Sequence, residues 1–157
     1  MWSPYEGLNN LISLLNHSTN EVRIGAMLGV GLTCNGIMNV KEDLPLNVLD
    51  VVLSFDIKES SSATMNDSYS AALLSLALSY ANTAREDLIP YLLKAIQNGN
   101  PTVAGVAAIA SGLIFCGRRP EALVIPLLER LAKITEEVEM QLGYLLMGFG
   151  LSMLYFV

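Results

Sequence analysis

The sequence predicts an all-α fold, an α-solenoid built from four helical hairpins. One short pattern of small and apolar residues recurs four times along the 157 residues, and no segment alternates apolar and polar side chains as a half-buried strand would. The composition agrees with a chain in which most side chains face the protein interior. Hydrophobic residues make up 52% of it and charged residues only 15%, against roughly 25% charged residues in a typical soluble domain.

The recurring pattern is a small residue, a second small residue two places later and an apolar residue directly after it. Its four copies lie in residues 25–36, 71–82, 106–117 and 144–155. The first small position is Gly29, Ser75, Ala110 and Gly148, and the second is Gly31, Ala77, Gly112 and Gly150. The second positions are 46, 35 and 38 residues apart, which is typical of helix-pair solenoids. Because glycine inside a helix costs about 1 kcal/mol relative to alanine, the pattern indicates that neighbouring helices pack closely.

Each small-residue helix is accompanied by a more amphipathic one, which gives the four hairpins. We expect helix pairs at about 5–16 and 20–35, 44–55 and 67–81, 84–97 and 101–116, and 120–133 and 136–156. The repeats then span about 1–36, 37–82, 83–117 and 118–157 of a single solenoid, 1–157.

Start and end signals support these boundaries. The pairs with capping-box spacing are Ser18 with Glu21 and Thr83 with Glu86. Pro101 and Pro120 stand where the first turn of a helix tolerates a missing amide. Asn35-Gly36, Asn98-Gly99 and Gly117 are expected to end helices in the left-handed conformation.

A polar, serine-rich stretch at 56–68 lengthens the first repeat step, and we expect it to be a mobile loop. Residues 42–67 hold six acids (Glu42, Asp43, Asp50, Asp56, Glu59, Asp67) against the single base Lys58, a local charge of −5. A solvated surface loop and a docking face for a basic partner are both consistent with this charge.

Charge and residue inventory exclude several function classes. The net charge of −6 argues against nucleic-acid binding, because phosphates are neutralised by clustered Lys and Arg. His17 is the single histidine, so a histidine-rich metal site lacks ligands unless other residue types substitute. A Ser-His-Asp arrangement would depend entirely on His17, which stands in the turn Asn16-His17-Ser18, where a helix-end residue is expected. We therefore expect no enzyme activity, metal or cofactor. Cys34 and Cys116 lie in apolar helical runs, as buried thiols do.

Membrane insertion is also disfavoured. The uncharged runs 103–117 and 142–157 are 15 and 16 residues long, short of the roughly 20 that span a bilayer. The first residues have no secretory signal, so we expect a location in the cytoplasm and nucleus. Both ends carry apolar residues without a polar capping helix, which suggests a fragment of a longer array that could self-associate.

The repeat pattern resembles the proteasome/cyclosome repeat, which occurs in the two largest non-ATPase subunits of the proteasome regulatory particle and in the largest subunit of the anaphase-promoting complex. Within this family, the opening Met1-Trp2 followed by GLNNLISLLNHSTNEVRIGAMLGVGLTCNGI is similar to the toroid region of the scaffold subunit that docks ubiquitin and ubiquitin-like domains. The segments REDLIPYLL and VAGVAAIASGLIFCG continue the likeness in order, so that it covers essentially the whole chain.

This resemblance implies a non-catalytic scaffold, part of a toroid beside the ATPase ring, that contacts other regulatory-particle subunits and offers its outer helices to ubiquitin or to the ubiquitin-like domains of shuttle factors. The matching outer helices are about 44–55, 84–97 and 120–133. They offer Asp50, Glu86, Asp87, Glu121 and Glu129 as candidate binding residues. The family pattern has a further acid about one turn before Glu129, where this chain has Ile125. The alternative is a purely structural array, of the paralogous proteasome or anaphase-promoting-complex scaffold, with no receptor role.

Overall fold

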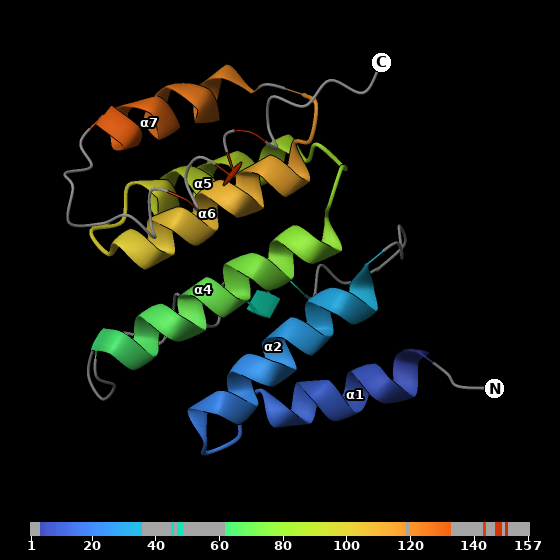
Figure 1. Cartoon of the computed structure of the whole chain (residues 1–157). Helices are drawn as coiled ribbons and strands as arrows, with labels where there is room; N and C mark the ends of the chain where they lie inside the picture. The colour runs from blue at the N-terminus through green and yellow to red at the C-terminus, as the bar shows by residue number, and fades with distance from the viewer. Residues whose placement is uncertain are drawn as a thin grey trace. The chain divides into compact units, whose positions relative to one another are not determined.

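The computed structural model describes residues 4–35, 62–118 and 120–132, with the single helical positions 45, 47, 48, 143, 147, 148 and 150. Within these residues all regular structure is helical and none is strand (Figure 1). The all-α prediction is thus confirmed for the described part of the chain, and its order of helices is consistent with an α-solenoid. The chain divides into two compact units, residues 1–79 and 80–157.

The first unit contains α1 (Pro4–Leu14), α2 (Asn20–Cys34) and α4 (Ser62–Ser79). Helix α2 packs against both α1 and α4, and Figure 1 shows it between them. Val30 of α2 and Leu73 and Leu76 of α4 are fully buried. Burying such a side chain stabilises the fold by about 1.5–3 kcal/mol, so this apolar layer holds the helices together.

The two small positions of α2 face different neighbours. A Cβ atom added to Gly29 would lie 2.9 Å from Cδ2 of Leu11 in α1, which is the far end of a flexible side chain. A Cβ added to Gly31 would lie 2.6 Å from the Cα and 2.7 Å from the carbonyl oxygen of Ser75 in α4. Backbone atoms cannot move aside as a side chain can. The predicted close packing of small-residue helices is therefore confirmed between Gly31 and Ser75.

The second unit contains the 3₁₀ turn η1 (Glu86–Leu88), α5 (Ile89–Ile96), α6 (Pro101–Ile114) and α7 (Glu121–Ala132). Helix α5 packs against both α6 and α7. Helix α6 is the most buried element, because small residues such as Ala104, Ala108 and Gly112 leave room for neighbouring backbones. Gly148, the fourth copy of the first small position, lies so close to Ala108 that a Cβ on it would collide with the Ala108 carbonyl group.

The helix starts follow the sequence signals in part. Pro101 opens α6 as expected, and Asn100 before it caps the helix by accepting hydrogen bonds from the amides of Thr102 (2.9 Å) and Val103 (3.2 Å). Neither capping box forms. The residue before α2 is Thr19, without a side-chain cap, and the Thr83 hydroxyl donates to the Tyr80 carbonyl at 2.7 Å. Pro120 precedes α7, which begins at Glu121.

The start of α4 corrects the sequence analysis. We expected a loop over 56–68, but α4 begins at Ser62, so residues 62–68 are helical, while 56–61 lie outside the described residues. A hydrogen bond to α2 accompanies the early start. The Ser68 hydroxyl donates to Oδ1 of Asn20 at 3.0 Å, so the first half of α4 is anchored on α2, and Tyr69 directly after it is buried.

Helix ends also differ from the prediction. Gly117 has the expected left-handed φ of 73°, whereas Asn35 is extended, with φ of −61°. The left-handed residues that the sequence did not indicate are Asn82 (φ 58°) and Ala84 (φ 53°), in the turn after α4. Among the described residues, no helix is both long and apolar enough to cross a membrane.

Candidate docking surface

The exposed sides of α5 and α7 differ in chemistry. The exposed residues of η1 and α5 are mostly polar or charged: Glu86, Asp87, Pro90, Lys94 and Gln97. Those of α7 are Glu121, Ala122, Ile125, Leu128, Glu129 and Ala132, spaced three or four apart as on one side of a helix. The other side of α7 buries Leu123 and Leu127, each 1% exposed. Helix α7 is thus anchored through one side and offers apolar groups on the other.

We call Glu121, Ile125, Leu128 and Glu129 the α7 stripe. Ile125 is 59% exposed and Leu128 is 46% exposed, so both leave apolar surface in contact with water. Glu121 stands one turn before Ile125, and Glu129 stands one turn after it; both are exposed. The stripe therefore combines two apolar side chains with acids at both ends, which suits a partner with an apolar patch and basic flanks.

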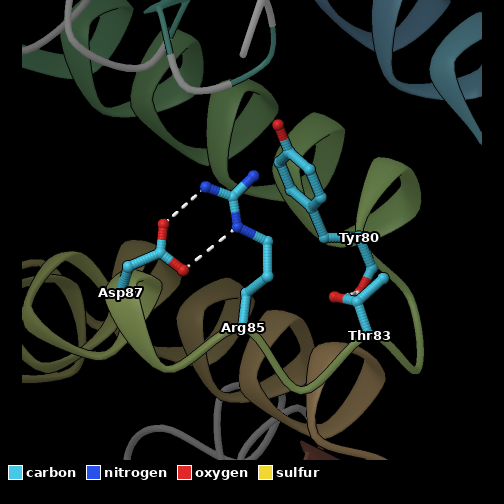
Figure 2. A network of polar contacts seen from close by, with 4 residues as sticks. All are labelled: Tyr80, Thr83, Arg85 and Asp87. Carbon is cyan, nitrogen blue, oxygen red and sulfur yellow. Dashed lines mark hydrogen bonds and ion pairs between the residues drawn. The ribbon is translucent and has the colours of Figure 1, made fainter. Parts of the chain in front are cut away.

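The corner before α5 holds a network of charged and aromatic groups (Figure 2). The guanidinium of Arg85 donates from Nε to Oδ1 of Asp87 at 3.0 Å and from Nη2 to Oδ2, and it lies 4.6 Å from the ring centroid of Tyr80. Because both partners of this ion pair are partly exposed, it contributes less than about 1 kcal/mol to stability. Its main effect is on charge, since Arg85 balances the carboxylate of Asp87.

The turn that carries this corner is tied to the end of α6. The amide of Asn82 donates to the carbonyl of Leu113 at 2.8 Å, and the amide of Ala84 donates to that of Ile114 at 3.0 Å. These bonds satisfy carbonyls that the helix itself leaves without partners. They also hold Ala84 in a conformation that L-residues rarely adopt. The position of Glu86 and Asp87 is therefore set by the end of α6.

The structure places four of the five predicted site residues. Glu86 and Asp87 are exposed in η1, and Glu121 and Glu129 are exposed near the two ends of α7, a helix that packs against α5. Asp50 lies outside the described residues. The four acids thus belong to one unit and to neighbouring elements, but only Glu121 and Glu129 flank exposed apolar side chains.

The apolar half of the stripe is not among the binding residues predicted from the sequence. Ile125 is named there only as a position where the family has an acid, and Leu128 is not named. Once Leu123 and Leu127 are assigned to the core, Ile125 falls on the opposite side of the helix, because consecutive residues are about 100° apart around the helix axis. A helical projection anchored on those two leucines could have found it.

The side chains that could bind a metal or act as nucleophiles lie apart from one another in the described part of the chain. Within the described ranges no three His, Cys, Asp or Glu side chains are grouped so that they could hold a metal ion. Nδ1 of His17 accepts a hydrogen bond from the Thr19 amide at 3.1 Å, so this ring stabilises a turn. Cys34 is buried as predicted, and burial raises its thiol pKa, whereas Cys116 is half-buried; both are free thiols.

Comparison with known proteins finds sequence similarity over most of the chain. No protein-family model matches the chain. The sequence is 25% identical over 154 residues to the 26S proteasome non-ATPase regulatory subunit 2 of Dictyostelium discoideum, an alignment that covers 96% of this chain and 16% of that protein. The described part of the chain is helical, and nearly the whole sequence is similar to a segment of a proteasome regulatory subunit.

Proposed function

We propose that the chain is a non-catalytic scaffold segment of the proteasome/cyclosome-repeat type, that it associates with other subunits of a proteasome regulatory particle, and that its α7 stripe docks ubiquitin or a ubiquitin-like domain. The similarity to a regulatory subunit supports the scaffold part of this proposal. The packing of Gly31 against the backbone at Ser75 supports the repeat type, because it uses the two small positions of the repeated pattern.

The observation that carries the docking part is the exposure of Ile125 and Leu128 between two acids. Removing the remaining exposed area of each side chain from water would contribute about 1 kcal/mol. Glu121 and Glu129 would steer a basic-flanked partner to the stripe, an effect that weakens as salt screens the charges. Asp87 contributes less to such steering than Glu86 does, because Arg85 already balances its charge.

A second candidate is a purely structural repeat array without a receptor role. It is favoured by two observations. The row of acids expected from the family is interrupted at Ile125, and the charge of Asp87 is balanced by Arg85. In that case the exposed apolar groups of α7 would contact a neighbouring subunit instead of ubiquitin.

A nitrogen-15 NMR titration of labelled ubiquitin with the 157-residue chain tests the docking proposal. We expect shifts confined to the apolar patch of ubiquitin, reduced by Ile125→Gln and by Glu129→Lys. The matched control is Glu21→Lys, which changes the net charge by the same amount at an exposed site in the first unit. Equal losses for Glu129→Lys and Glu21→Lys would mean that net charge, not the stripe, causes binding. If no shifts appear at millimolar concentration, the docking proposal is refuted and the purely structural array is the remaining candidate.

A further inference from the structure

Thr83 is an exposed residue of the turn between α4 and η1, in the segment Thr83-Ala84-Arg85-Glu86-Asp87. We propose that Thr83 is a phosphorylation site for an acid-directed serine/threonine kinase, and that the added phosphate draws Arg85 away from Asp87. The proposal concerns this turn alone. It does not depend on what the α7 stripe binds, so the two can fail separately.

The hydroxyl of Thr83 is accessible. The residue is exposed, as are Ala81 and Asn82 before it, and it belongs to no helix. Its Oγ1 donates one hydrogen bond, to the Tyr80 carbonyl at 2.7 Å, and its amide donates to the same carbonyl at 3.1 Å. A kinase can therefore engage the hydroxyl by opening a short irregular segment, at a much smaller cost than unwinding a packed helix.

The acids that follow Thr83 supply the recognition signal. Glu86 and Asp87 lie three and four residues after it and are both exposed, as the cationic cleft of an acid-directed kinase requires. Two other described hydroxyl residues have an acid three places on, Ser18 and Thr64. Ser18 is followed by Glu21 alone, and Thr64 is half-buried inside α4. Thr83 is thus the described site that combines an irregular backbone with two acids.

The chemical step is an ordinary phosphoryl transfer from a nucleoside triphosphate. Oγ1 of Thr83 forms a bond to the γ-phosphorus while the bond between that phosphorus and the β,γ-bridging oxygen breaks. The nucleoside diphosphate leaves, and the hydroxyl proton passes to the base of the kinase. No oxidant or further reactant is needed.

Phosphorylation of Thr83 would change the charges and hydrogen bonds in the turn before α5. A phosphate ester carries about −1.5 to −2 charges and has no hydroxyl proton, so the bond from Oγ1 to the Tyr80 carbonyl is lost. The guanidinium of Arg85 can bind a phosphate in the same bidentate geometry in which it binds Asp87, and the phosphate carries the larger negative charge. Arg85 would therefore move toward the phosphate and away from Asp87.

The test is incubation of the 157-residue chain with Mg²⁺, ATP and an acid-directed kinase, followed by mass spectrometry of intact protein and peptides. We expect one added phosphate, mapped to Thr83 and absent in Thr83→Ala. The double variant Glu86→Gln, Asp87→Asn should slow the reaction at least about fivefold through the loss of two charge contacts. Ser18→Ala should leave it unchanged. Circular dichroism establishes that each variant is folded.

A phosphorus-31 NMR titration of the modified chain tests the role of Arg85. The second pKa of the phosphate should lie about half a unit or more below its ordinary value near 6, and Arg85→Gln should restore that value. Modification elsewhere, no modification, or a rate indifferent to the two acids would overturn the assignment of the site. A phosphate pKa that Arg85→Gln leaves unchanged would overturn the exchange of partners.

Discussion

The contact between Gly31 and Ser75 gives the sharpest stability prediction. In Gly31→Ala the new methyl group would lie 2.6 Å from Cα and 2.7 Å from the carbonyl oxygen of Ser75, so α2 and α4 must move apart. Overpacking of this kind costs about 1–3 kcal/mol. The same substitution gains about 1 kcal/mol of helix propensity, which would partly hide the cost in a single measurement.

Gly25 provides the matched control, because it lies in the same helix, is exposed and has no atom within 4 Å of an added Cβ. The propensity gain is common to Gly25→Ala and Gly31→Ala, so the difference between the two variants isolates the packing cost. We expect Gly25→Ala to be the more stable by about 1–3 kcal/mol. For a chain of this length the difference corresponds to roughly 2–12 °C in Tm.

Urea unfolding followed by far-UV circular dichroism measures this difference as a shift of the midpoint at constant slope. Equal midpoints for the two variants would refute the reasoning, because they would mean that the two helices are not in backbone contact at this position. A changed slope for Gly31→Ala alone would show that the first unit unfolds separately from the second.

Four further predictions concern individual side chains. Ser75→Ala should stabilise the chain by about 1 kcal/mol in the same unfolding experiment, because the Ser75 hydroxyl is buried and has no hydrogen-bond partner in the structure. Asn100→Ala should destabilise it by about 1 kcal/mol through loss of the α6 cap, with Asn100→Asp as the variant that retains an acceptor. An aromatic disulfide reagent should modify half-buried Cys116 before Cys34, which is 3% exposed. Because burial raises the pKa of the Cys34 thiol and of Tyr69, the native state retains their protons longer than the unfolded state does. The contribution of these two groups to stability should therefore be constant below pH ~8 and fall above it, as urea midpoints measured at several alkaline pH values would show.

Much of the helical layout could be predicted from the sequence. Helix α6 could be predicted from Pro101 after Asn100 and from the run of small residues through Gly112. These signals are local, because proline sets the geometry of the first turn and small side chains leave room for close packing. The early start of α4 could not be predicted, since the serine-rich stretch before Tyr69 is helical through tertiary contacts with α2, including the bond from Ser68 to Asn20. The helix propensities of the individual residues do not include the effect of such contacts.

The candidate surface also combines features that the sequence indicates with features that depend on tertiary contacts. The resemblance indicates Glu121 and Glu129 as candidate binding residues, and the structure shows that both are exposed on α7. The ion pair between Arg85 and Asp87 depends on a turn with two left-handed residues that are not glycines, Asn82 and Ala84. Alanine has no preference for that conformation, and the turn adopts it because α6 supplies the hydrogen-bond acceptors.

The bonds from that turn to α6 have a consequence for the order in which the chain folds. The carbonyls of Leu113 and Ile114 are synthesised after the amides of Asn82 and Ala84 that bind them. Until α6 has formed, these amides are hydrated and nothing favours the unusual backbone at Ala84. The contacts of α1, α2 and α4 need no residue beyond Ser79, so they can form first on a growing chain. The turn that presents Glu86, in contrast, lacks its hydrogen-bond acceptors until α6 has been synthesised.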